Sequence, residues 1–211
     1  MINYNVPFYS NTPEGTHCFQ AVLKMVLKYF LPQEEYSFEE LDKKTAKVKG
    51  LWTWEMAGLL WLKKKGFKIE NIGMFDYKRF SEEGEKYLID FFGEEVGEAQ
   101  ITHCKVSQEM DNAKKFLEEI QSEKRVPKIK EIINFLNNEY LVVCVVNSRA
   151  LNNISGYSGH FILIKGYENN SFIVHDPGLP GQENRKVDFD LFEESWGYPN
   201  QNAKNILSLK I

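Results

Sequence analysis

Three side chains capable of nucleophilic or acid–base chemistry stand at the ends of predicted elements. Cys18 begins a predicted helix, where free backbone N–H groups and the positive end of the helix dipole favour a thiolate. His160 opens a predicted strand of otherwise apolar residues, and Asp176 ends the following strand. Nucleophilic catalysis by cysteine needs a lowered thiol pKa, a base and a group that orients the base. Each residue also has a structural interpretation: a small buried thiol, a hydrogen-bonded histidine, and a turn-former in Asp-Pro-Gly.

The elements that must position these residues divide the chain into a helical first half and a strand-rich second half. Hydrophobic patterning and capping residues predict helices over 17–31, 37–46, 53–66, 76–92, 107–121 and 127–138. Apolar runs predict a short strand over 67–72 and further strands over 141–146, 160–167, 171–176 and 207–211, the last of which closes the sheet. In the first helix, Gln20, Lys24 and Lys28 form the one polar stripe, so we expect its other faces to be buried.

The expected fold is therefore α+β, with a helical N-terminal lobe over about 1–138 and an antiparallel C-terminal sheet over about 139–211 in one domain. The chain has 211 residues, with 26 basic and 30 acidic side chains and a net charge of -4. It has no polybasic stretch, which argues against binding to nucleic acid or an anionic membrane.

The first residues show no basic region followed by an apolar stretch, so we expect no signal peptide, and the sequence contains no apolar run long enough to cross a membrane. Its three cysteines are too few and too widely spaced for a disulfide framework, so we expect a reduced, cytoplasmic protein. No cofactor is indicated, and no metal site is expected, because the Thr-His-Cys segments at 16–18 and 102–104 lack the spacing of zinc ligands.

Several segments combine into a more specific pattern. They are Val-Pro-Phe-Tyr-Ser-Asn at 6–11, Cys18 and Ala21 entering a buried helix, Gly-His-Phe-Ile-Leu at 159–163, and Asp176-Pro177. Together they resemble the papain-like peptidases related to the bacteriocin-processing, double-glycine leader peptidases. The segment 50–67 is similar to the middle region of that family, whereas 75–138 has no counterpart and is interpreted as a helical insertion.

The resemblance implies a papain-like fold, a peptide or amide substrate, and a triad in which Cys18 is the nucleophile, His160 the base and Asp176 the orienting acid. The family usually places a glutamine upstream of the cysteine as an oxyanion donor. The matching stretch here has Asn11, which is one methylene shorter and has the same amide chemistry. The family's usual Cys-Gly-Pro-Ala is replaced by Cys-Phe-Gln-Ala at 18–21, and the preceding residue is His17.

Aromatic residues near the expected cleft form a second group of candidates. Tyr157 and Trp196 are candidate lining residues, whereas Trp52, Trp54 and Trp61 are expected to pack in the interior. Three functions follow from the sequence: hydrolysis of a peptide or amide bond, acyl transfer to an amine by the same residues, or binding by an inactive peptidase-like module. The last is motivated by Asn11 and Phe19. The sequence leaves the substrate and the oligomeric state open.

The triad imposes a condition on the hairpin that carries His160 and Asp176. Directly opposed residues of a regular antiparallel pair share a face, and faces alternate along each strand. His160 and Asp176 can therefore lie on one face only if the two position numbers of each opposed pair sum to an even number. A two-residue turn at Asn169-Asn170 would give odd sums and send Asp176 to the wrong face. The sequence therefore predicts either a loop with an odd number of residues or a bulge. On the same strand pattern, we expect His175 to face away from Asp176.

The remaining two thiols are expected to be less reactive than Cys18. Cys144 lies inside an apolar strand, where burial raises the pKa of a thiol and blocks access. Cys104 lies in a mixed segment and is expected to keep an ordinary thiol pKa.

Overall fold

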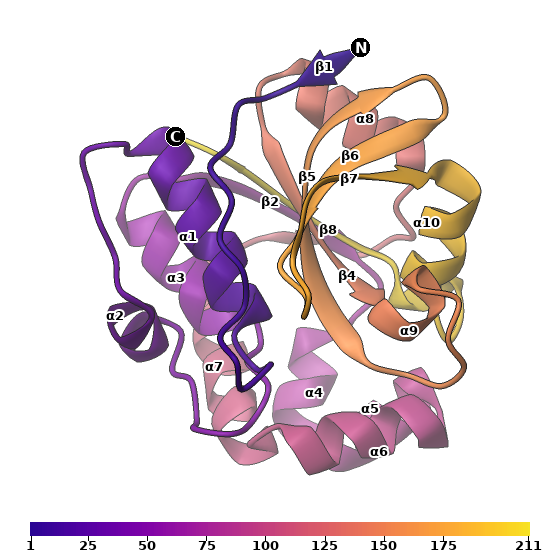
Figure 1. Cartoon of the computed structure of the whole chain (residues 1–211). Coiled ribbons are helices and arrows are strands. Elements are labelled where there is room, and N and C mark those ends of the chain that lie inside the picture. Colours follow the sequence, from indigo (N-terminus) through magenta and orange to yellow (C-terminus); the bar gives the residue numbers. More distant parts are fainter.

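An eight-stranded sheet runs through the molecule in a computed structural model that describes residues 1–211 (Figure 1). The strands are β1 (Ile2–Asn3), β2 (Lys68–Gly73), β3 (Ser122–Glu123), β4 (Leu141–Asn147), β5 (Gly159–Glu168), β6 (Ser171–Asp176), β7 (Gln182–Asp188) and β8 (Asn205–Lys210). Their order is β3-β2-β8-β4-β5-β6-β7, and β1 pairs with β5. All pairs are antiparallel except that of β2 with β3.

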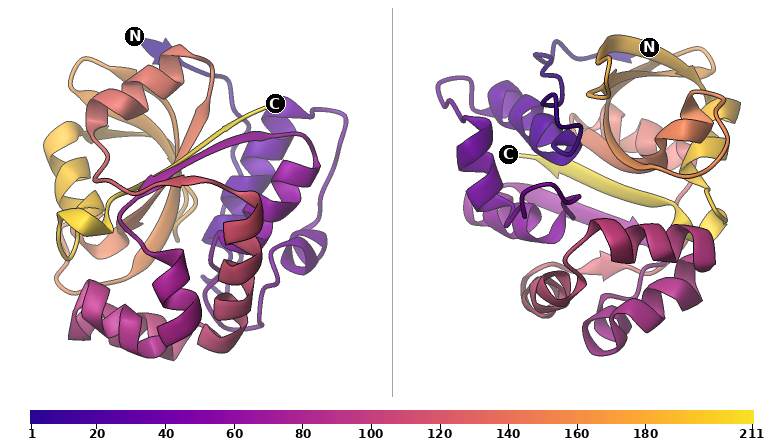
Figure 2. Two further views of the ribbon diagram at one scale, coloured as in Figure 1. Left: turned by 180° about the vertical axis from the view of Figure 1, so that it is seen from behind. Right: turned by 60° about the horizontal axis from the view of Figure 1, so that its bottom comes forward.

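Helices cover both faces and one end of this sheet (Figures 1 and 2). They are α1 (Cys18–Phe30), α2 (Phe38–Lys44), α3 (Met56–Lys64), α4 (Tyr77–Glu83), α5 (Glu85–Phe92), α6 (Glu94–His103), α7 (Val106–Glu119), α8 (Ile129–Asn137), α9 (Ser148–Leu151) and α10 (Phe189–Trp196), with a short 3-10 turn at Gln201–Ala203. The group α1–α3 lies on one side of the sheet and α8 and α10 on the other, while α4–α6 form a layer at one end. None of the helices is both long and apolar enough to cross a membrane.

Alternate residues of β4 and β5 enter two separate hydrophobic cores. Val143 and Leu163 pack against α1 and α3, while Val142 and Ile164 belong to the core under α8 and α10. This alternation explains why both strands read as continuous apolar runs, because successive side chains of a strand point to opposite faces. The expected α+β, papain-like architecture is confirmed.

Several boundaries differ from the sequence-based expectations. Strand β2 agrees with the short strand expected over 67–72, but β1 and β3 were not expected, and β8 lies between β2 and β4 and does not close the sheet. The expected helix over 76–92 is two helices, α4 and α5, because Gly84 has a positive φ of 56°. The helix expected over 53–66 begins later, at Met56, with Glu55 as its N-cap.

Among the elements that the sequence did not predict, β7 and α6 have an evident reason, and the burial of one side chain was also unexpected. The strand β7 is mostly polar and exposed, so it carries no apolar signal, and α6 has only a weak apolar face. Gln20 is fully buried, which contradicts its expected place on the polar stripe. Its Nε2 donates hydrogen bonds to Thr45 Oγ1 at 2.8 Å and Thr53 Oγ1 at 3.0 Å. Gln20 can be buried because these two threonines, which lie outside α1, accept its hydrogen bonds. The spacing of residues along a helix does not reveal such partners.

The hairpin of β5 and β6 meets the condition set by the triad. The chain turns at Asn169 and Asn170, with Glu168 opposite Ser171. The register then shifts, because Gly166 pairs with Ile173 but Ile164 pairs with Val174, which leaves Lys165 as an extra residue. The predicted bulge is confirmed, and it moves Asp176 to the face that carries His160. The Lys165 ammonium is held by Asn3 Oδ1 at 2.6 Å and Asn184 Oδ1 at 2.8 Å.

Gly166, beside the bulge, lies directly against the backbone of β1, where a Cβ would overlap the carbonyl oxygen of Ile2. We expect Gly166→Ala to lower the free energy of unfolding in urea by about 1–3 kcal/mol, because β1 or the bulge must shift. Gly73→Ala is the matched control, since a Cβ at this strand glycine comes no closer than 3.4 Å to any atom. Equal losses for the two variants would contradict the constraint at the bulge.

Candidate active site

Cys18 is the first residue of α1, and it is half-buried. No side chain caps this helix end, so its backbone N–H groups are left for other partners. The adjacent Phe19 packs on Phe161 of β5, with ring centroids 4.7 Å apart. This contact joins the residues that follow Cys18 and His160, and so it holds the start of α1 against the start of β5.

His160 lies between Cys18 and Asp176. Its Nε2 is 2.7 Å from Asp176 Oδ1, and its ring is close enough to the Cys18 thiol to lower the pKa of that thiol. The structure thus brings together the three residues that the sequence selected. His160 and Asp176 are both buried, with 7% and 3% of their surface exposed, so water competes little for these bonds.

The carboxylate of Asp176 has two further partners. Its Oδ1 also accepts a hydrogen bond of 2.9 Å from the backbone N–H of Gly178, and its Oδ2 accepts one of 2.8 Å from Arg185 Nη1. Arg185 in turn donates to the carbonyl of Leu151 at 2.6 Å. Sequence analysis missed Arg185, because it lies in the polar strand β7 and has no local pattern that marks it.

The electrostatics of the three residues favour an ion pair of thiolate and imidazolium. Burial raises the pKa of the Cys18 thiol, but His160 together with the backbone N–H groups of Phe161 and Phe19 outweighs burial, and the pKa lies below its ordinary value. Burial lowers the pKa of His160, whereas Asp176 and Cys18 raise it, with a net result of about 10. Burial also raises the pKa of Asp176, but the hydrogen bonds and charge of His160 and the contacts of Gly178 and Arg185 bring it to about 2.

Asn11 is buried beside the start of α1. Its Oδ1 accepts a hydrogen bond of 2.7 Å from the backbone N–H of His17, and its own N–H donates to Pro177 O at 2.8 Å. Its Nδ2 donates no hydrogen bond within the protein. The side chain is thereby anchored through its oxygen at the residue before Cys18, and its amide hydrogens remain available.

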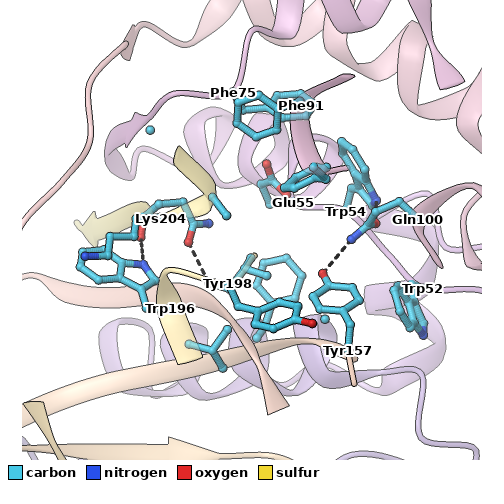
Figure 3. A pocket seen from close by; sticks show the side chains of 18 of the residues that line it. Trp52, Trp54, Glu55, Phe75, Phe91, Gln100, Tyr157, Trp196, Tyr198 and Lys204 are labelled. Carbon is cyan, nitrogen blue, oxygen red and sulfur yellow. Dashed lines mark hydrogen bonds between the residues drawn. The ribbon is translucent and has the colours of Figure 1, made fainter. Parts of the chain in front are cut away.

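A cavity of about 1040 Å³, counting the part open to solvent, begins at Cys18 and extends under the end layer of helices. Both predicted lining residues, Tyr157 and Trp196, lie in its wall. Trp52 and Trp54 line it too, although the sequence suggested only interior packing for them. Trp61 packs on Tyr36 at 5.3 Å between ring centroids and is outside the cavity. The labelled side chains in Figure 3 surround this open space.

Comparison with known proteins agrees with the arrangement of these elements. The model of the Peptidase C39 like family matches residues 3–204. The chain belongs to this peptidase C39-like family. The resemblance found from short segments is therefore confirmed over almost the whole chain. No curated protein sequence matches the chain.

Solved structures of C39 peptidases share the fold at low sequence identity. The peptidase domain of Streptococcus ComA, a bifunctional ABC transporter of a quorum-sensing pathway, is 16% identical, with a TM-score of 0.52 and coverage of 97% of this chain and 98% of that one. A putative C39-like peptidase from Bacillus anthracis is 18% identical, with a TM-score of 0.52 and coverage of 100% and 98%. A double glycine motif protease from an AMS/PCAT transporter, solved with its leader peptide, is 13% identical, with a TM-score of 0.50 and coverage of 99% and 93%.

The other residues considered from the sequence lie outside the contacts of Cys18, His160 and Asp176. His175 points to Val6 O at 2.8 Å and accepts a hydrogen bond from Asn184 N, so it faces away from Asp176 as expected. Burial raises the pKa of Cys144 well above its ordinary value. Burial also raises the pKa of Cys104 to about 12, although Trp54 donates a hydrogen bond to it. The ordinary pKa expected for Cys104 is therefore wrong.

These pKa shifts predict the reactivity of the thiols in this C39-like protein. At pH 6, iodoacetamide should alkylate Cys18 faster than Cys104 or Cys144, because only the Cys18 thiol has a lowered pKa. The rate at Cys18 should fall as the pH drops through its pKa and the thiolate is protonated. Mass spectrometry after short exposures measures each site. In urea the three rates should converge, and faster labelling of Cys104 or Cys144 in the folded protein would contradict the assignment.

Proposed function

We propose that this C39-like protein is a cysteine peptidase in which Cys18 is the nucleophile, His160 the general base and acid, and Asp176 the group that orients His160. The observation that carries the proposal is that His160 is hydrogen-bonded to Asp176 at 2.7 Å and lies close enough to Cys18 to lower the pKa of its thiol, while Cys18 also lines the cavity. Membership of a peptidase family and a papain-like fold support the same reaction class. The substrate is a peptide, as for the protease solved with its leader peptide.

The reaction follows from the ion pair. The Cys18 thiolate attacks the carbonyl carbon of the scissile bond, and the oxyanion that forms receives hydrogen bonds from the Cys18 N–H and from Asn11 Nδ2. Protonated His160 gives its proton to the leaving amine, which breaks the C–N bond and leaves a thioester on Cys18. His160 then removes a proton from water, which attacks the thioester, and the thiolate is restored. Asp176 keeps the ring in position and balances its charge throughout.

The two alternatives from the sequence lead to different experimental results. Acyl transfer would use the same thioester but pass it to an amine, and product analysis with competing amines separates it from hydrolysis. An inactive binding module would show no accelerated alkylation of Cys18. The cytoplasmic location expected from the sequence stays a prediction, as does the interpretation of 75–138 as an insertion.

Variants of the three residues test the proposal. With a peptide library as substrate and mass spectrometry as readout, Cys18→Ala and His160→Ala should each lose activity to background, because the two groups act as one unit. Asp176→Asn should lower turnover by about 10²–10⁴-fold, because the ring loses its orienting charge. Cys144→Ala is the control for loss of a thiol in the core and should keep turnover. Cleavage that persists in Cys18→Ala would overturn the proposal.

Asn11 offers a separate test through two substitutions. Asn11→Asp keeps an oxygen for the His17 N–H but removes the amide donor, whereas Asn11→Ala removes both. We expect both variants to lower kcat by about 10²-fold or more, because a donor to the oxyanion is lost, while thermal unfolding should be affected more by Asn11→Ala. Asn11→Gln restores the amide one methylene further out and should retain more activity than either. Unchanged kcat in Asn11→Asp would place the donor elsewhere.

A further inference from the structure

The cavity that begins at Cys18 is lined by aromatic rings from several parts of the chain. Phe75 and Phe91 lie on one side of the open space and Tyr157 and Tyr198 on the opposite side, as Figure 3 shows. Trp54 also lines it. Because Cys18 lines this cavity, a peptide bound at its thiol lies beside this space.

Glu55 places a carboxyl group among these rings. It lines the cavity, and its one hydrogen bond to another side chain is received from Tyr77 Oη at 3.1 Å. Tyr77 is held by Asn71 Nδ2 at 3.2 Å, so the contact has a fixed geometry. The pKa of Glu55 is raised, because burial outweighs the opposing effects of its own backbone N–H and of Tyr77. As the N-cap of α3, Glu55 also lies at the positive end of a helix dipole, which favours its charged form.

No cation of the protein balances this carboxyl group. Lys204 is the only lysine in the cavity wall, and its ammonium pairs with Glu193 and lies 5.1 Å from the centre of the Trp196 ring. Burial and, less strongly, the charge of Glu55 raise the pKa of the neighbouring Glu109 to about 7, so Glu109 supplies no positive charge either. An acidic group inside an aromatic enclosure fits an organic cation, which gains from both the charge and the faces of the rings.

We propose that this cavity is a substrate subsite that takes a basic side chain of the peptide, with Glu55 as its counter-ion and the surrounding rings as cation–π partners. The identity of the occupant as part of a substrate rests on the proposed peptidase function. The preference of the cavity for a cation does not depend on that function, because it requires only the cavity and its lining residues. The two are tested separately.

Binding is tested on the whole protein with n-butylammonium, which matches a lysine side chain, and with butan-1-ol, which has similar size and no charge. We expect n-butylammonium to bind about 10-fold more tightly, as measured by titration of the indole N–H signals in NMR spectra. The signals of Trp52, Trp54 and Trp196 should shift, while that of Trp61 serves as an internal control outside the cavity. Equal affinity for the two probes, or shifts confined to Trp61, would overturn the proposal.

Two isosteric variants separate Glu55 from its acidic neighbour. Glu55→Gln should abolish the preference for n-butylammonium while butan-1-ol still binds, which shows that the cavity is intact. Glu109→Gln removes a buried acid that does not line the cavity and should leave the preference within about 2-fold of the wild type. A preference that persists in Glu55→Gln would overturn the proposal. If that variant does not fold, the titration of the wild type decides, since equal affinity for the two probes would overturn the proposal.

The activity measurement uses peptide pairs that differ only in lysine or norleucine at each position near the scissile bond. We expect lysine at one position to raise kcat/KM by about 10-fold, and Glu55→Gln to remove that ratio. If no peptide is cleaved while n-butylammonium still binds with the expected preference, the proposed function fails and the cation site stands. If cleavage occurs with no lysine preference at any position, the subsite proposal fails and the peptidase stands.

Discussion

The buried carboxylate of Asp176 receives hydrogen bonds from His160 on β5, from the backbone of Gly178 and from Arg185 on β7. An ionised group this deep is stable only while its partners stay in place, and loss of a single partner from such a network costs on the order of 3–5 kcal/mol. The registers of β5, β6 and β7 are therefore tied to one another through this charge. The bulge at Lys165 in β5 makes this arrangement possible, since without it Asp176 would face away from His160.

Packing of aromatic side chains positions α1, the helix that carries Cys18, against these strands. Phe19 packs on Phe161. Phe19 follows Cys18 in the chain and Phe161 follows His160, so this contact brings the two reactive residues close together. Phe19 in turn lies over Gly58 of α3, where a Cβ would come within 2.7 Å of its ring. The departure from the usual Cys-Gly-Pro-Ala thus has a structural explanation, because the larger side chain fills space that Gly58 leaves open. It sits in the core, and so it need not obstruct the thiol.

The sequence was sufficient for features that depend on local patterns. The position of Cys18 at a helix start, the buried strands β4 and β5, and the need for a bulge all follow from periodicity and spacing. Features that depend on long-range partners were out of reach. Arg185 lies in a polar, exposed strand, so nothing nearby in the chain indicates its contact with Asp176. The burial of Gln20 likewise depends on Thr45 and Thr53, which belong to other segments.

A cluster of aromatic residues would ordinarily collapse into a closed core, because burial of their surfaces is favourable. In this cluster, hydrogen bonds between polar side chains and the rings keep the rings apart. Gln100 accepts a hydrogen bond from the Trp54 indole at 3.1 Å and donates one to Tyr157 at 3.0 Å, so one side chain fixes two walls. Asn71 and Glu55 hold Tyr77 in the same way. The cavity beside Cys18 is thus built into the folded state by buried polar groups, which would be left unsatisfied if the rings closed over it.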